Sequence, residues 1–114
     1  MSHSAYISGP ITNDANYLMH FAKANIHLLE FKTFKEVINP ANNIDEDTGW
    51  TDAMESNIDA LFYLHRTNVR VTIYLLKGWE DSAGSRIELA IAKNLGFDII
   101  YEEQESGGED DTLC

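Results

Sequence analysis

Short apolar segments with the length and composition of β-strands recur four times along the chain. They cover residues 5–8, 34–39, 69–76 and 97–101. The third segment, VRVTIYLL, is apolar or β-branched at nearly every position, as expected for a strand covered on both faces. The first three segments stop at turn residues, namely Gly9-Pro10, Pro40 and Gly78. The pattern therefore predicts four strands, three of them followed directly by a turn.

The three intervals between these segments show the periodicity of amphipathic helices. The expected helices begin at caps, which are Asn13 or Asp14, Thr51 or Asp52, and Ser82. The first runs to about Leu29, and the third ends at Gly96, where a C-terminal cap is expected. The expected inward faces are Leu18, Phe21, Ala22, Leu28 and Leu29; Met54, Ile58, Leu61 and Phe62; and Ile87, Ala90, Ile91 and Leu95.

The resulting order is βαβαβαβ, which predicts a single α/β domain with a parallel sheet of about four strands and flanking helices. We expect this domain to span residues 1–102, with residues 103–114 as a tail. In open α/β sheets ligands bind outside the carboxyl ends of the strands. The three turns after the predicted strands fall at that edge, so the edge is the expected binding site.

The distribution of charge supports the same division of the chain into a domain and a tail. The net charge is −11, and six acids with no base follow Tyr101, which leaves 13 acids and 8 bases in residues 1–101. The tail is therefore expected to be disordered and solubilising, or alternatively to bind a partner. The acidic balance argues against a nucleic-acid partner.

The remaining composition excludes several further classes of protein. The single cysteine, Cys114, excludes an internal disulfide and a cysteine-based zinc cluster. No apolar run reaches the length of a membrane span, and no signal peptide is recognised, so a cytoplasmic protein without membrane contact is expected. His20 and His27 share a helix face without a carboxylate at ligand spacing, and no metal or cofactor is expected.

Glu88 is the most informative single residue. On a helix it lies about 200° from Arg86 and about 140° from Lys93, so it does not belong to the charged stripe. Its neighbours one turn away are apolar or small. This placement favours a carboxylate in a cleft, although a partly buried carboxylate that pairs locally remains the alternative.

Ser82, Gly84 and Glu88 form an S-x-G-x-x-x-E pattern at a strand-to-helix turn. A serine hydroxyl and free N–H groups at a helix start suit an anion or a sugar hydroxyl. An ordinary N-cap serine would give the same pattern.

Several segments together resemble a family of small phage and bacterial proteins. They are YISGPIT, VINPA, WTDAM, IYLLKGWEDSAGSRIELAIAKNLG and IIYE, within roughly residues 5–102. That family is similar to the nucleoside 2-deoxyribosyltransferases and the 2'-deoxynucleoside 5'-monophosphate N-glycosidases. The resemblance implies a flavodoxin-like or Rossmann-like fold, a small-molecule nucleoside or nucleotide ligand, and a homodimer. Exposed aromatic residues of the dimer surface would include Phe21, Phe31, Phe62 and Tyr63.

The resemblance also implies roles for individual residues. Glu88 falls on the nucleophile of these enzymes, and Ser82 falls on a phosphate-binding serine of the monophosphate N-glycosidases. The first loop would line the nucleoside pocket with Tyr6, Ser8, Gly9, Pro10 and Ile11. Thr12 stands where those N-glycosidases carry an arginine, and Asn57 stands where relatives usually carry an aspartate. Residues 65–70 resemble an insertion.

The expected chemistry is cleavage or transfer at the N-glycosidic bond of a 2'-deoxynucleoside or its 5'-monophosphate. A carboxylate below C1' can stabilise the oxocarbenium-like transition state or form a glycosyl intermediate. Asp59, or Asn57 with it, would help the base to leave, unless Asp59 lies on a solvated helix face. Trp79 and Tyr6 would stack on the base or belong to the core, and Gly78 and Asn39 would shape the surrounding loops. The rival functions are a nucleotide-binding protein without turnover and an interaction protein.

Overall fold

The computed structural model describes residues 3–11, 14–44 and 47–104. Its four strands form one parallel sheet in the order β2-β1-β3-β4. The strands are β1 (His3–Ser8), β2 (Glu36–Ile38), β3 (Arg70–Leu75) and β4 (Asp98–Tyr101). This is a flavodoxin-like strand order, in which the direction of winding reverses beside β1. The predicted α/β domain with a four-stranded parallel sheet and flanking helices is thereby confirmed.

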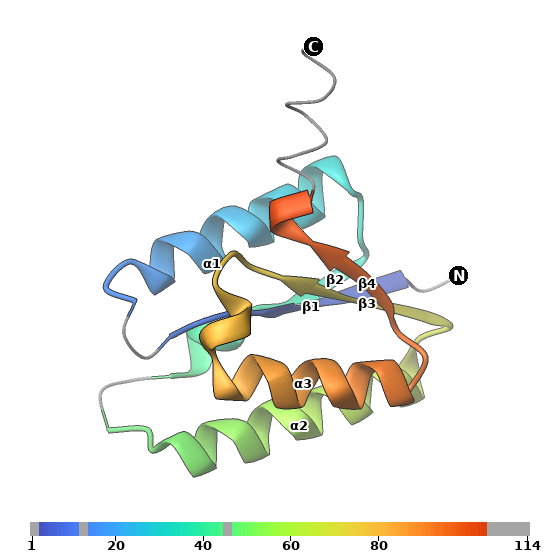
Figure 1. The fold of residues 1–114 in the computed structure, drawn as a ribbon. Helices are drawn as coiled ribbons and strands as arrows, with labels where there is room; N and C mark the ends of the chain where they lie inside the picture. Colours follow the sequence, from blue (N-terminus) through green and yellow to red (C-terminus); the bar gives the residue numbers. More distant parts are fainter. Residues whose placement is uncertain (1–2, 12–13, 45–46, 105–114) are drawn as a thin grey trace.

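Helices cover both faces of this sheet (Figure 1). On one face lies α1 (Tyr17–Ile26), continued by the π-helical turn η1 (His27–Phe31). On the other face lie α2 (Trp50–Thr67) and α3 (Ala83–Asn94). Short 3-10 turns follow two strands, η2 (Pro40–Asn43) after β2 and η3 (Trp79–Asp81) after β3.

The side chains of the sheet alternate between two cores, one on each face. On β1, Ala5 and Ile7 pack toward α1 with Phe21 and Leu28. Tyr6 points the other way, into the core formed with α2 and α3. Ser4 and Ser8 share the orientation of Tyr6 because successive side chains of a strand point to opposite faces. The face that carries α2 and α3 therefore receives every hydroxyl of β1.

The first helix differs from the prediction in its start and in its buried face. Asp14 does not cap it; instead, the Asp14 carboxylate accepts the Asn16 N–H, and the helix begins at Tyr17. The buried residues are Phe21, Ala24 and Leu28, whereas Leu18, Ala22 and Leu29 are exposed. Phe21 and Leu28 were predicted to face inward, and both do. The other three predicted residues lie on an adjacent apolar stripe of the same helix, and the spacing alone does not say which stripe meets the sheet.

The other two helices follow the prediction more closely. Helix α2 begins two or three residues earlier than expected, because Gly49 takes the cap position in place of Thr51 or Asp52. It buries Met54, Leu61 and Leu64 but leaves Phe62 41% exposed. The predicted Ser82 cap of α3 is confirmed, since Ser82 Oγ accepts the Ser85 N–H at 3.2 Å. Its buried side chains are Ser85, Glu88, Leu89 and Ala92, whereas the predicted Ile87 and Ala90 are exposed.

Glycine is required at the end of α3 and at the end of β1. Gly96 has φ +81 and ends α3 with the paired hydrogen bonds of a Schellman motif, Gly96 N to Lys93 O and Phe97 N to Ala92 O. A Cβ at Gly9 would lie 2.8 Å from Leu76 Cβ, so β1 and β3 approach each other too closely there for any other residue.

Among the described residues, no helix is long and apolar enough to cross a membrane.

Candidate functional site

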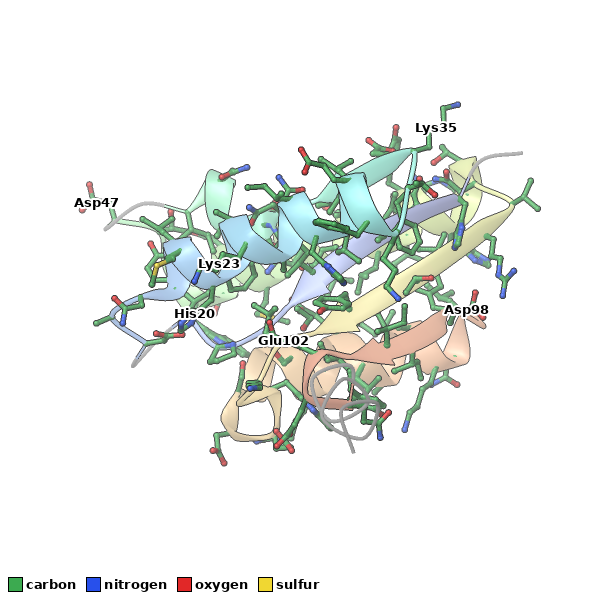
Figure 2. All side chains as sticks on the ribbon, turned by 90° about the horizontal axis from the view of Figure 1, so that it is seen from above. His20, Lys23, Lys35, Asp47, Asp98 and Glu102 are labelled. Atoms are coloured by element: carbon green, nitrogen blue, oxygen red, sulfur yellow. The ribbon has the colours of Figure 1, made fainter. Side chains whose placement is uncertain are left out.

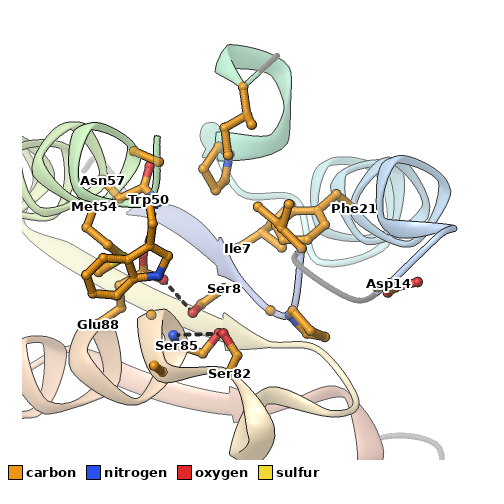
Figure 3. Close-up of a pocket in the computed structure, with 18 of the residues that line it drawn as sticks. Ile7, Ser8, Asp14, Phe21, Trp50, Met54, Asn57, Ser82, Ser85 and Glu88 are labelled. Atoms are coloured by element: carbon orange, nitrogen blue, oxygen red, sulfur yellow. Dashed lines mark hydrogen bonds between the residues drawn. The ribbon is translucent and has the colours of Figure 1, made fainter. Parts of the chain in front are cut away.

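A cavity of about 690 Å³ lies at the carboxyl ends of the strands. Its volume is within the range of small-molecule sites. The end of β1 and the first loop form one wall, and the starts of α2 and α3 form the other (Figure 3). The turns after β2 and β3 also contribute to the lining, through residues that include Pro40 and Gly78. The cavity therefore occupies the edge at which ligands of such sheets bind.

Glu88 lies in the wall of this cavity and is 4% exposed. Its carboxylate accepts three side-chain hydrogen bonds. Ser8 Oγ donates to Oε1 at 2.6 Å (Figure 3), and Tyr6 Oη and Asn57 Nδ2 each donate to Oε2 at 3.1 Å. Two of these donors come from β1 and one comes from α2. The carboxylate is thus held in one orientation by two elements other than its own helix.

The charge state of this cluster follows from its burial. Burial raises the pKa of Glu88, and the hydrogen bonds from Ser8, Asn57 and Tyr6 oppose that rise. Burial and the adjacent Glu88 carboxylate raise the pKa of Tyr6 well above its usual value, so its hydroxyl stays protonated and remains a donor. A buried carboxylate with a raised pKa at a cavity wall is a common feature of functional sites.

The start of α3 adds hydrogen-bonding groups beside the carboxylate. Ser82, Ala83, Gly84 and Ser85 all line the cavity. Ser82 Oγ is engaged with the Ser85 N–H, whereas the buried Ser85 Oγ has no hydrogen-bond partner among the described residues. Gly84 allows α3 to pack against α2, because a Cβ there would lie 2.9 Å from Met54 Sδ. A helix start with an unsatisfied buried hydroxyl is suited to a polar or anionic ligand group.

A second carboxylate, Asp14, lies at the first loop and lines the cavity. Its Oδ2 is 2.9 Å from His20 Nδ1. The sequence analysis found no carboxylate partner for His20, but the structure supplies one in Asp14, six residues earlier in the chain. The Asn16 N–H is the main cause of a lowered pKa at Asp14, and His20 lowers that pKa further. The described residues contain no group of three or more metal-ligating side chains.

Most of the residues expected to bind substrate come together at the cavity. The lining includes Ser8, Gly9, Pro10, Ile11, Gly78, Ser82 and Gly84. Tyr6 lies behind the lining and reaches the site only through its hydrogen bond to Glu88. Thr12 is outside the described residues.

Three expected site residues lie elsewhere. Asp59 is exposed on α2 and does not line the cavity, because it is about 200° around the helix from Asn57. Trp79 packs on Tyr101 with ring centroids 5.7 Å apart and joins the core on the α3 face. Asn39 caps η2 by accepting the Ala41 N–H. Trp79 thus takes the core position that the sequence analysis left open as its alternative. Asp59 likewise takes its alternative, a solvated helix face.

Residues 65–70 are not a loop over the site. They complete α2 and begin β3, with Asn68 as the C-cap residue of the helix. Arg70 pairs with Asp98 at 2.6 Å at the amino end of the sheet. Figure 2 shows Asp98 and Lys35 at that end, away from His20 on α1. Arg70 therefore lies at the opposite edge of the sheet from the cavity.

Other lining residues were missed or underrated by the sequence interpretation. They include Asp14, Phe21, Trp50, Met54, Asp81 and Ser85. A signal existed for Trp50, Met54 and Asn57, which are spaced by four and three residues like the buried positions that follow them on α2. Asn57 replaces Asp59 as the polar side chain that α2 directs to the carboxylate.

The fold and the site together define an α/β domain with a ligand cavity at the carboxyl edge of its sheet and one buried carboxylate in the cavity wall. The chain belongs to the family described as Domain of unknown function (DUF4406), which matches residues 3–101. No curated protein and no solved structure matches the chain.

Proposed function

We propose that the cavity binds a 2'-deoxynucleoside or its 5'-monophosphate and that Glu88 cleaves its N-glycosidic bond. The observation that carries this proposal is the buried Glu88 carboxylate, which faces the cavity and is fixed by Ser8, Tyr6 and Asn57. The resemblance of the GWEDSAG…E segment to the nucleoside 2-deoxyribosyltransferases and the monophosphate N-glycosidases supports the same role.

In the proposed reaction a Glu88 oxygen attacks C1' as the bond from C1' to the base nitrogen breaks. The departing base takes the bonding electrons and is protonated by solvent water, and the water or base that attacks in the second step returns a proton to solvent. Water, or a second base, then displaces Glu88 from C1' and restores the free carboxylate. The three hydrogen bonds orient the carboxylate before reaction, which removes part of the entropic cost of attack. Asp59 has no part in this scheme because it lies outside the cavity lining.

The nucleophile must be ionised, and its raised pKa sets where activity begins. Activity is expected to rise with pH as Glu88 loses its proton, and the midpoint is expected above the ordinary glutamate pKa of 4.5. The Ser8 hydrogen bond limits that shift, since it stabilises the ionised form.

The second candidate function is nucleotide binding without turnover. It is favoured by Asn57, because an amide cannot donate a proton to the leaving base as an aspartic acid could. A buried carboxylate could then serve as a hydrogen-bond acceptor for a ligand hydroxyl.

One experiment separates the two functions. The protein is incubated with the four common 2'-deoxynucleosides and their 5'-monophosphates, free base is quantified by chromatography, and binding is measured in parallel by calorimetry. Release of base supports the glycosidase. Tight binding without release supports the binding protein. If the protein neither binds these ligands nor releases base, both candidate functions are refuted.

We also propose that the protein forms a homodimer. Apolar side chains of Leu18, Met19 and Ile26 are 47–57% exposed on α1, and Leu29 and Phe31 of η1 are 42% and 74% exposed. Phe21, expected at this surface, is instead fully buried beneath α1. Light scattering at micromolar concentration is expected to give twice the mass of 12.9 kDa, and a monomer mass would refute the dimer.

A further inference from the structure

Two tryptophans flank the site region, and their surroundings differ sharply. Trp79 packs on Tyr101 and is partly buried in the core. Trp50 lines the cavity and is 52% exposed. Burial of a tryptophan side chain is strongly favourable, so an exposed indole at the wall of a cavity is an unusual use of this residue.

The position of Trp50 on α2 explains why it is uncovered. Residues 50, 54, 57, 61 and 64 lie within about 40° of one line along a helix, so they form a single stripe. Leu61 and Leu64 are fully buried under the sheet, and Met54 is 7% exposed. The stripe therefore faces inward along its whole length, and Trp50 continues it past the sheet to the cavity.

The same stripe relates the indole to the carboxylate. Asn57, two turns after Trp50, donates to Glu88 Oε2 at 3.1 Å. Seven residues of helix correspond to about 10 Å along the axis, so the indole and the carboxylate lie at different depths of one cavity. Figure 3 shows Trp50, Met54 and Asn57 along one side of the cavity, opposite Phe21 on the α1 side.

We infer that Trp50 is the stacking platform for the base of the ligand and selects a flat heteroaromatic leaving group. This inference rests on the proposed function, in which Glu88 takes the sugar. With C1' at the carboxylate, the base extends along the α2 stripe toward the indole. A π-face offers stacking without a hydrogen-bond pattern, so Trp50 favours nucleobases as a class over aliphatic or purely sugar-like groups, and it does not choose among them.

Tryptophan fluorescence tests this directly, because Trp50 and Trp79 are the only two tryptophans of the chain. Two variants, Trp79→Phe and Trp50→Phe, each leave one emitter, and both carry Glu88→Gln to prevent turnover. The probes are the four 2'-deoxynucleoside 5'-monophosphates and 2-deoxyribose 5-phosphate, which lacks a base. The nucleotides are expected to quench Trp50 and leave Trp79 unchanged, and the sugar phosphate is expected to quench neither.

Calorimetry on Trp50→Ala in the same background supplies the second readout. Nucleotide affinity is expected to fall about 5- to 150-fold, the range for loss of one base–aromatic stack. Affinity for 2-deoxyribose 5-phosphate is expected to stay the same. Trp50 is the first residue of α2, so alanine is compatible with the helix, and an unchanged melting temperature serves as the folding control.

Two outcomes contradict the inference and differ from each other. If nucleotides bind with unchanged affinity to Trp50→Ala and do not quench Trp50, the stacking role is wrong while the proposed function stands. If no nucleotide binds to the parent Glu88→Gln protein or to wild type, the proposed function is wrong and the inference falls with it.

Discussion

The two buried serines of β1 show how differently the two ends of the sheet use the same hydroxyl. Ser4, at the amino end, donates to Asn68 Oδ1 at 2.7 Å, and Ser8, at the carboxyl end, donates to Glu88 Oε1 at 2.6 Å. Both serines are almost completely buried, at 0% and 1% exposure. Asn68 is neutral and also donates to Leu64 O at the end of α2. At the amino end, these buried polar groups therefore form their hydrogen bonds with other groups of the protein.

At the carboxyl end the acceptor is a carboxylate beside a cavity. Burial raises the pKa of Glu88, which means that the folded state holds the ionised form less favourably than the unfolded chain does. The amino end is therefore built for stability, and the carboxyl end gives up stability for a fixed charge. Such a trade is typical of functional sites.

Glu88→Gln is expected to have the largest effect on this comparison. The amide is nearly isosteric but cannot attack C1', so release of base by chromatography is expected to fall to background. Unchanged release would refute Glu88 as the nucleophile.

The same variant tests the cost of the buried charge. Because the folded pKa is raised, the stabilisation from protonated Glu88 is fully present below the unfolded value near 4.5 and is lost as pH rises through the folded pKa. Glu88→Gln is therefore expected to gain free energy of unfolding relative to wild type as pH rises. Denaturation at pH 4 and pH 8 measures the change. If the free energy of unfolding of the variant, relative to wild type, were lower at pH 8 than at pH 4, the prediction would be contradicted.

Ser82→Ala is expected to have the next largest effect. A charge-assisted hydrogen bond from Ser82 to a 5'-phosphate is worth roughly 1.5–3 kcal/mol, or about 10- to 150-fold in affinity. The preference for a deoxynucleoside monophosphate over the nucleoside is therefore expected to be modest and to disappear in the variant. Calorimetry with both ligands measures it.

Arg70→Ala provides the matched control for Ser82→Ala at the amino end of the sheet. It is expected to leave the phosphate preference unchanged. A large preference that survives Ser82→Ala would mean that another group holds the phosphate, and the unpartnered Ser85 hydroxyl is the first to examine.

The paired variants Ser4→Ala and Ser8→Ala address the comparison itself. Ser4→Ala leaves the Asn68 oxygen without its donor and is expected to cost about 1–2 kcal/mol of unfolding free energy, with activity unchanged. Ser8→Ala removes a group that lowers the pKa of Glu88, so the acid limb of the activity profile is expected to move to higher pH. Denaturation curves and pH–rate profiles separate the effects. Equal shifts of the pH profile in both variants would remove the contrast between the two ends.

Deletion of residues 104–114 is expected to have the smallest effect, with no appreciable change in melting temperature or ligand affinity. The segment has almost no apolar side chains to bury. Of the tail expected at residues 103–114, residues 105–114 lie outside the described residues. A loss of several degrees on deletion would show that the tail packs on the domain.

The sequence predicted the strands and the site edge well because local chemistry determines both. Gly9-Pro10 and Gly78 are turn residues that follow the ends of β1 and β3. Ser82 and Gly96 cap α3, and serine and glycine are residue types that favour those two cap positions. Glu88 could be separated from the charged stripe of α3 because helix periodicity fixes its direction. These features need no knowledge of neighbouring elements.

The phase of a helix against the sheet was less predictable. Asn57 and Asp59 are both polar residues on α2. The spacing of Asn57 from Met54 and Leu61 is compatible with an inward position, and the packing of Leu61 and Leu64 under the sheet shows that Asn57 takes it. Similarly, Trp50 and Trp79 are equally aromatic in the sequence. Which one is left uncovered depends on where α2 passes the end of the sheet, which is a tertiary property.

The hydrogen bonds of Glu88 also determine when the site can exist during folding. Tyr6 and Ser8 are 82 and 80 residues away from Glu88 along the chain, and Asn57 is 31 residues away. Parallel pairing of β1 with β3 also joins residues that are remote in the sequence, such as His3 with Arg70, so the topology has a high contact order and is expected to fold slowly. Ligand binding should therefore return only with the last phase of refolding, which would make it a reporter of the completed fold.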